Sequence, residues 1–159
     1  MIRILLCGVV AVSIAVPAFA WPIAPENAGK VLTNAGSEEV EVTWLGDDVA
    51  RLDAKKGEYY YSVRLMNCDD SRTCSSAMFF STFTMDGAPD FSMYERTNLY
   101  NDSYPFGRAF ILPSGDDETY AVGVDYGIDL QNEHNFDEED LNLFEEIIIS
   151  YTSHMSEED

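Results

Sequence analysis

The chain has 159 residues, of which 29 are acidic and 9 are basic, and its formal net charge is −20 at pH 7. So negative a chain repels phosphate backbones and anionic lipid headgroups, which argues against binding to nucleic acids. A hydrophobic content of 46% with 9 Phe and 9 Tyr argues against disorder. We interpret the charge as a source of solubility; attraction to a basic partner or loose cation binding is the alternative.

The N-terminal segment has the pattern of a secretory signal peptide. A positively charged start precedes an apolar run over 4–16, and Ala18-Phe19-Ala20 has the A-x-A form of a signal-peptidase site. The run is short for a membrane span, and no stop-transfer charges follow it. We therefore expect residues 1–20 to be removed after Ala20, which predicts a periplasmic or secreted protein without membrane attachment. An uncleaved anchor is the alternative.

Residues 21–159 are expected to form a single domain, which begins with a helix and a strand. The helix opens at Pro25-Glu26, carries apolar residues at helical spacing and stops before Gly36. Over 39–45, valines and Trp44 alternate with Glu and Thr, which is typical of a half-buried strand.

The remaining pattern completes an α+β domain. Strands are predicted over 58–67, 76–85, 107–112 and 119–126, with a candidate return strand over 49–53. Helices are predicted over 91–100 and 133–153. Asn132 or Asn135 can cap the last helix, whose acidic start over 137–140 suits the helix dipole. The expected order is α-β-β-β-α-β-β-α, with hairpin-linked strands in an antiparallel sheet and the helices on one face.

The sequence lacks the residue combinations that metal binding or catalysis needs. Structural zinc takes about four Cys or His ligands, whereas Cys68, Cys74, His134 and His154 are the only such residues after residue 20. The two histidines are too far apart along the chain to share a helical turn. Neither a G-x-S-x-G nucleophile motif nor a glycine-rich phosphate loop is present. We therefore expect no metal, no cofactor and no catalytic residue, and hence a protein that is not an enzyme.

Cys68 and Cys74 flank a short polar stretch between two predicted strands. An even number of cysteines in an exported chain favours a disulfide. A thioredoxin-like redox centre has C-x-x-C before a helix, but here five residues separate the cysteines and strands flank them. A structural disulfide is therefore favoured over a redox role, and we expect it to stabilise by about 2–3 kcal/mol. Arg72, within the stretch, has no evident role beyond solubility.

The disulfide also predicts how the two strands pair. If Cys68 faces Cys74, opposed residues have numbers that total 142. One face then carries a core set of Tyr59, Tyr61, Val63, Leu65, Ala77, Phe79, Ser81 and Phe83. The other, wetter face carries Tyr60, Ser62, Arg64, Met66, Ser76, Met78, Phe80, Thr82 and both cysteines. A slip of one residue would scramble this separation, so the disulfide and the apolar pattern agree.

Several short stretches follow one another in a specific order over roughly 25–155: Tyr61-Ser62-Val63, Asn67-Cys68, Cys74 to Ser81, Phe106-Gly107-Arg108-Ala109-Phe110-Ile111-Leu112, Gly115-Asp116, Val122 to Asp125 and Asn135-Phe136. In these stretches and their order the chain resembles the YbjN-domain family, whose members are described as bacterial sensory transduction regulators. The chain departs from the family pattern at 94–98, which replaces a Trp-Asn-Arg-like segment, and at Tyr104-Pro105, which replaces a basic lead-in.

This resemblance implies a fold like that of type III secretion chaperones, with a twisted antiparallel sheet flanked by helices and no known catalytic residues. Our first hypothesis is a non-enzymatic interaction or regulatory module whose protein partner is unknown, and a homodimer is compatible with it. Its candidate interaction face consists of Tyr60, Arg64, Met66, Met78 and Phe80, residue types common in interfaces; the alternative is that a helix covers this face. The second hypothesis is a thiol–disulfide redox protein using Cys68 and Cys74, and a hydrolase ranks last.

Overall fold

The computed structural model describes residues 22–113, 118–131 and 134–156, so the expected signal peptide lies outside the described residues. The elements are α1 (Pro25–Asn34), β1 (Glu38–Trp44), β2 (Val49–Lys56), β3 (Tyr59–Cys68), β4 (Cys74–Asp86), α2 (Phe91–Ser103), β5 (Arg108–Pro113), β6 (Thr119–Asp129) and α3 (Glu138–Ser156). The strands form one antiparallel sheet in the order β1-β2-β3-β4-β6-β5. The α+β class is therefore confirmed.

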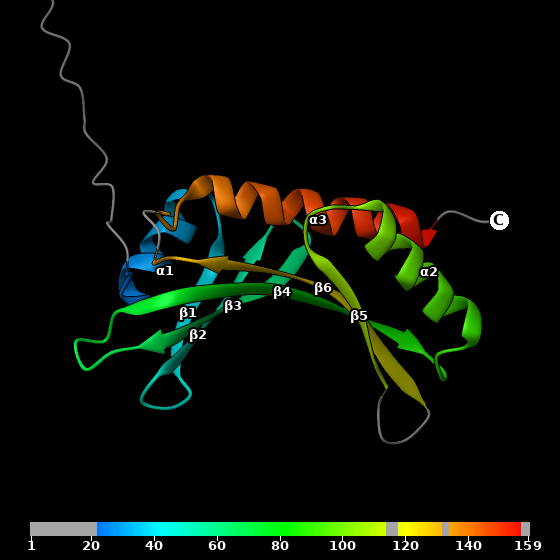
Figure 1. Cartoon of the computed structure of the whole chain (residues 1–159), viewed down its shortest axis with the longest axis horizontal. Helices are drawn as coiled ribbons and strands as arrows, with labels where there is room; N and C mark the ends of the chain where they lie inside the picture. The colour runs from blue at the N-terminus through cyan, green and yellow to red at the C-terminus, as the bar shows by residue number, and fades with distance from the viewer. Residues whose placement is uncertain (1–21, 114–117, 132–133, 157–159) are drawn as a thin grey trace, which may run out of the picture.

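The three helices of the described chain lie on the same side of the sheet (Figure 1). α1 packs against β1 and β2, α2 against β5, and α3 against β6 and both other helices. The sheet is twisted and arched beneath them, and its opposite face is left without a helix over it (Figure 1). The expectation of helices on one face is thus confirmed for the described residues.

The first run of strands has one more member than the predicted order. The candidate return strand over 49–53 forms β2 and extends to Lys56, so four strands precede α2. Burial explains this strand, because Ala50, Leu52 and Ala54 are buried while the residues between them are half-buried. The turn after it lies at Gly57, which has a φ of 60° that glycine adopts without strain.

β3 and β4 pair in the register that the cysteines predicted. Val63 lies opposite Phe79, Leu65 opposite Ala77, and Cys68 opposite Cys74. The predicted core face is buried along its centre, with Tyr59 and Phe83 half-buried at the ends. Phe79 lies at the middle of an aromatic cluster, and its ring centroid is 5.5 Å from that of Phe136, 5.3 Å from Phe144 and 6.5 Å from Tyr61. Burying this face, with its aromatic contacts, contributes to the hydrophobic stabilisation of the fold.

α2 is confirmed, although its sequence has little helical amphipathicity. The side chain of Asp90 accepts a hydrogen bond from the backbone N–H of Met93 at 2.9 Å and so caps the helix. On the inner side, Tyr100 is fully buried and its hydroxyl lies 2.7 Å from the hydroxyl of Ser150 on α3. The helix is therefore fixed by its cap, by the buried Tyr100 and by polar contacts to α3 and β5, rather than by a continuous apolar stripe.

α3 begins at Glu138, five residues after the predicted start, and Asn135 does not cap it; Asn132 lies outside the described residues. Asp137 accepts from the N–H of Glu139 at 2.9 Å, while Asp140 accepts from the N–H of Asp137 at 3.1 Å. The two carboxylates thus satisfy backbone donors of the first turn, as in a capping box. The buried carboxylate of Asp140 also lies 2.8 Å from Nε2 of His134, and burial raises its pKa.

Tyr61 provides a test of the packing beneath α3. Its hydroxyl lies 2.6 Å from that of the buried Ser37, and burial raises the pKa of Tyr61 to about 12. The unfolded chain releases this proton near pH 10, so folding stability should be retained below pH 10 and lost as the pH rises towards 12. At pH 11 the loss from this one residue is about 1–1.5 kcal/mol.

We predict that Tyr61→Phe loses less stability than the wild type between pH 9 and pH 11, measured by urea unfolding. At pH 8 the variant should be weaker by about 1–2 kcal/mol, because the Ser37 hydroxyl loses its partner. The control is Tyr60→Phe, at an exposed tyrosine one position away. Equal alkaline losses in Tyr61→Phe and wild type would contradict the assignment.

Candidate functional site

The open face of the sheet brings the five predicted interaction residues together. Arg64 lies opposite Met78 in the β3–β4 pair, and Ser62 lies opposite Phe80. Met66 follows on β3, while Tyr60, at the other end, is 63% exposed. The other four residues are half-buried. No helix of the described chain covers this face, so the alternative of a covering helix does not hold for these residues (Figure 1).

Cations on this face lie over aromatic rings. The guanidinium carbon of Arg64 is 5.5 Å from the centroid of the Phe80 ring, and Nζ of Lys55 is 5.2 Å from that of Tyr60. The Arg64 Nε is buried and has no hydrogen-bond partner among the described residues. A buried donor without an acceptor is costly. The face therefore presents a cation that is held in place by stacking rather than by a carboxylate.

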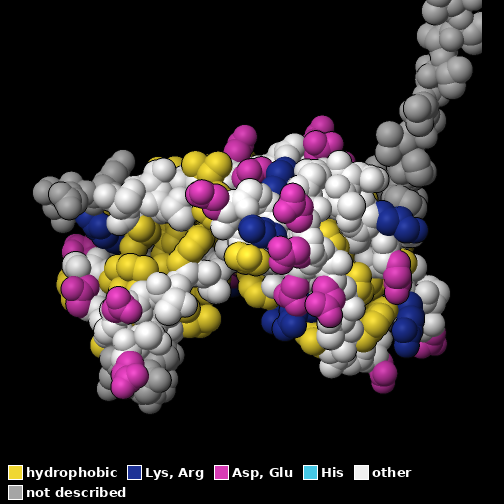
Figure 2. Space-filling view, turned by 180° about the vertical axis from the view of Figure 1, so that it is seen from behind, with side chains coloured by type: hydrophobic (Ala, Val, Ile, Leu, Met, Phe, Trp, Pro, Cys, Tyr) yellow, Lys and Arg dark blue, Asp and Glu magenta, His cyan; other side chains and the backbone are white. Residues whose placement is uncertain are grey.

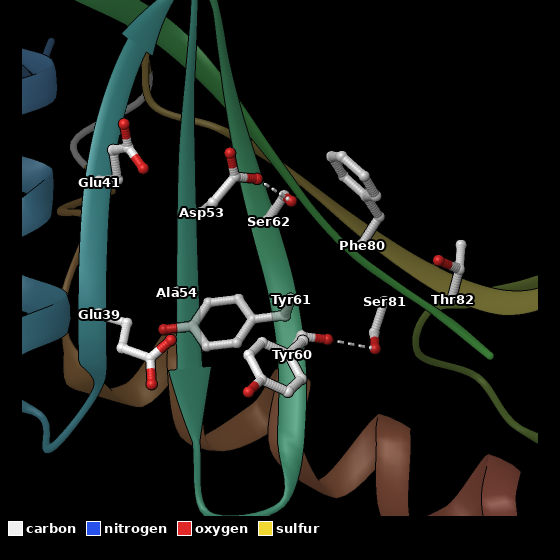
Figure 3. A pocket seen from close by; sticks show the side chains of 10 residues that line it. All are labelled: Glu39, Glu41, Asp53, Ala54, Tyr60, Tyr61, Ser62, Phe80, Ser81 and Thr82. Carbon is white, nitrogen blue, oxygen red and sulfur yellow. Dashed lines mark hydrogen bonds between the residues drawn. The ribbon is translucent and has the colours of Figure 1, made fainter.

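The face is hollowed next to these residues. A cavity of about 370 Å³ opens between β1 and β4, lined by Glu39, Glu41, Asp53, Ala54, Tyr60, Tyr61, Ser62, Phe80, Ser81 and Thr82 (Figure 3). Asp53 receives hydrogen bonds from Nε of Arg51 at 2.9 Å and from the hydroxyl of Ser62 at 2.6 Å. Glu39 and Glu41 extend from β1 at the rim and have no ion-pair partner among the described residues (Figure 3).

Glycines on β6 shape the far side of the open face. Gly127 lies opposite Met78, and a Cβ at this position would meet nothing within 4 Å. At Gly123 the Phe110 ring covers the backbone instead, so that a Cβ would come within 2.8 Å of it. The surface is thus open beside Met78 and filled beside β5. Seen from behind, the molecule is hollowed on the side away from the helices, and acidic, basic and hydrophobic side chains all lie near the hollow (Figure 2).

The structure contains the predicted disulfide between Cys68 and Cys74, but places it differently with respect to the two faces. Cys74 is fully buried in the core, and backbone hydrogen bonds pair it with Ile23 in both directions. Cys68 is half-buried against the same core. The expectation that both cysteines lie on the wetter face is therefore wrong. Asn67, with a φ of 54°, breaks the alternation of β3 just before Cys68.

The loop between the cysteines is organised by its own side chains. One carboxylate oxygen of Asp69 accepts from the backbone N–H of Ser71 at 2.9 Å and of Thr73 at 3.1 Å. The hydrogen bond from the Ser71 hydroxyl, together with these backbone bonds, lowers the pKa of Asp69. Arg72 adopts a φ of 59° and stacks over Trp44, with its guanidinium carbon 4.7 Å from the ring. Arg72 therefore ties the loop to β1, a role that the sequence did not suggest.

The other polar side chains considered as ligands have structural partners. Nε2 of His154 lies 2.9 Å from the backbone oxygen of Arg96, and His134 pairs with Asp140. Within 22–113, 118–131 and 134–156, no group of three or more His, Cys, Asp or Glu side chains could hold a metal ion. In the same ranges no helix is long and apolar enough to cross a membrane.

Sequence reasoning found the open face but missed the acidic rim of its cavity, which consists of Glu39, Glu41 and Asp53. Glu39 and Glu41 were expected only as the wet side of a strand, and Asp53 as the end of another. The register of β1 on β2 shifts between Glu38 and Glu41, where Glu39 has a φ of 54°. Nothing in a Glu-Val-Glu-Val run indicates such a shift, because the irregularity depends on how the strand meets its neighbour.

A family model matches residues 29–153, and its description is YbjN, "Putative bacterial sensory transduction regulator". The match covers most of the chain and includes every strand, α2 and most of α1 and α3. No curated protein and no solved structure matches the chain. The likeness to type III secretion chaperones that the resemblance implied therefore remains a prediction.

The disulfide is predicted to stabilise the fold and to resist reduction. Replacing both cysteines by Ala should lower the free energy of unfolding by about 2–3 kcal/mol, because the unfolded chain regains the freedom of a short closed loop. Urea unfolding of the variant and the wild type measures this difference.

The burial of Cys74 also predicts a reduction potential of the disulfide below about −300 mV in a glutathione titration. A potential near that of thioredoxin-class oxidants would contradict a purely structural bond.

Proposed function

Because the chain belongs to the YbjN family, we propose that it is a non-catalytic regulatory module that binds another protein through the open face of its sheet after export from the cytoplasm. The observation that carries the proposal is a contiguous set of half-buried Arg, Met and Phe side chains, with the exposed Tyr60 beside them, on a face that no helix of the described chain covers.

The chemistry of the face supports a binding role. Aromatic residues, Met and Arg are enriched in protein interfaces, and Arg and Tyr are frequent among the residues that carry binding energy. Arg64 has a buried Nε without an acceptor, and its guanidinium is already ordered over Phe80. Ordering a side chain before binding reduces the entropy lost on association. Met78 adds a flexible apolar contact that adapts to the shape of a partner.

The surroundings of Cys68 and Cys74 favour the binding module over the redox alternative. A thiol that attacks a disulfide must be accessible and carry a lowered pKa. Cys74 is fully buried and pairs with the backbone of Ile23, and the loop between the cysteines is fixed by the side chain of Asp69. These features support a staple that fixes the β3–β4 register.

Export is supported by the pattern of residues 1–20 and by the disulfide. Disulfides form and persist in the periplasm and outside the cell, and they are rare in the cytosol. The structure ties the chain to the core from Ile23, three residues after the proposed cleavage point, through the two backbone bonds to Cys74. Removal of residues 1–20 would therefore leave the whole described domain intact.

We predict that Met78→Asp with Phe80→Asp abolishes capture of the protein's partner from envelope extract, because two carboxylates would have to be desolvated at the interface. Pull-downs with mass spectrometry, together with light scattering for a homodimer, measure the change. The matched control is Phe91→Asp with Leu99→Asp, which places the same charges at exposed apolar positions of α2. The use of this face would be refuted if the Met78→Asp, Phe80→Asp variant kept its partners and its assembly state while its circular dichroism showed a native fold.

We predict that the mature protein begins at Trp21. Intact-mass measurement and N-terminal sequencing of protein recovered from the periplasmic fraction test this prediction. Replacing Ala18 and Ala20 by bulky residues should block cleavage and leave the longer form with the membrane fraction. Recovery of a full-length chain from the cytosol would contradict export.

A further inference from the structure

The two edges of the sheet differ in how their backbone groups are satisfied. At the β5 edge, the side-chain amide of Asn101 donates to the carbonyl of Ala109 at 3.1 Å and accepts from its N–H at 2.7 Å. Asn101 therefore occupies both outward backbone groups of Ala109, which an added strand would otherwise bond. A sheet edge without such cover is a template for an added strand.

The β1 edge has no such cover within the part of the chain that the structure describes. The regular stretch Glu41–Trp44 pairs with residues 50–53 of β2, and no other described residue hydrogen-bonds to the backbone of this stretch. β1 is the outermost strand on its side of the sheet (Figure 3). Its outward backbone donors and acceptors are therefore available to an incoming segment.

On the helix side, this edge borders an apolar groove. A cavity of about 350 Å³ lies between α1 and β1, lined by Glu26, Gly29, Lys30, Thr33, Asn34, Val40 and Val42. Val40 and Val42 are half-buried and form its apolar part. A Cβ at Gly29 would lie 3.6 Å from each of the two valines, so a side chain at this position would point towards the groove's apolar part.

On the open side, the same edge carries the acidic rim. Glu41 lies beside Asp53, whose charge is already paired with Arg51, while Glu39 and Glu41 have no ion-pair partner among the described residues. A strand alternates its side chains between two faces. A segment added to β1 would therefore place every second side chain in the apolar groove and the others beside Glu39 and Glu41.

We propose that β1 is a docking edge for an extended segment of a partner in which apolar and basic residues alternate. Backbone hydrogen bonds supply the attachment, the groove takes the apolar side chains, and the glutamates select the cations. This inference goes beyond the proposed function, since it uses the edge of the sheet rather than its face.

A second copy of this chain fits the edge poorly. Each copy carries a net charge of −20, and β1 paired with itself would bring two sets of Glu39 and Glu41 together. Like charges opposite each other on a sheet are destabilising. Acidic side chains at an edge thus disfavour self-association while they favour a basic partner.

The test uses a peptide of about seven residues that alternates Lys and Val, with the full mature chain. We expect binding by fluorescence polarisation, with new hydrogen-exchange protection confined to residues 40–44. The charge-reversing variant Glu39→Lys with Glu41→Lys should weaken binding about 5- to 30-fold. The matched control, Glu95→Lys with Asp102→Lys on exposed positions of α2, changes the net charge equally and should bind as the wild type does.

Three further peptides decide between an added strand and loose charge attraction. Each should bind at least tenfold more weakly than the alternating Lys and Val peptide. The first alternates Glu and Val, the second collects the same Lys and Val residues into blocks, and the third carries N-methyl groups on alternate amides. Equal binding by the block peptide or the methylated peptide would overturn the proposal. The proposal would also be overturned if residues 40–44 were already protected from hydrogen exchange without peptide, and if this protection disappeared when the chain was shortened to begin at residue 22.

The outcome is independent of the open face. The pull-down with the Met78→Asp, Phe80→Asp variant reports on the face alone, whereas peptide binding to the wild type reports on the edge alone. If that variant loses its natural partner while the wild type ignores the peptide, the proposed function stands and the docking edge is wrong. If the peptide binds at 40–44 and the variant keeps its partner, the edge stands and the role of the face is wrong.

Discussion

The pairing of β3 with β4 is the constraint on which the other features depend. The register decides that Val63, Leu65 and Phe79 face the helices while Arg64 and Met78 face away. Side chains alternate along a strand, so a shift of one residue would exchange the two sets. The disulfide between Cys68 and Cys74 closes one end of this pair. The core and the open face are thus two outcomes of a single alignment.

Much of the fold could be predicted because local sequence and packing agree in it. The alternation in β3 and β4 and the turn residues between strands indicate the same antiparallel sheet that the structure contains. The start of α3 could not be placed, because 133–137 has residues compatible with a helix. There the carboxylates of Asp137 and Asp140 satisfy the first-turn donors and fix the start. The position of Cys74 depended on Ile23, a contact between segments far apart in sequence.

The candidate site was predictable to the extent that it follows from alternation. The five residues of the open face were identified because the register fixed their side of the sheet. The acidic rim was not, since Glu39 lies at a break in the β1–β2 register and Asp53 is held in part by Ser62 of the neighbouring strand β3. The contact between Arg72 and Trp44 could not be predicted either, because Trp44 belongs to β1, which is not adjacent in the sheet to the strands that flank the loop of Arg72. Such features depend on tertiary neighbours.

The cover that Asn101 provides over Ala109 has a consequence for stoichiometry. A sheet that can be extended at both margins can propagate, since each unit offers one margin and accepts another, and such head-to-tail contacts produce filaments. Here the Asn101 amide occupies the outward backbone groups of Ala109 at one margin, which disfavours strand addition at that position. For a chain rich in strand-forming residues, partial cover of one margin works against head-to-tail growth by strand pairing.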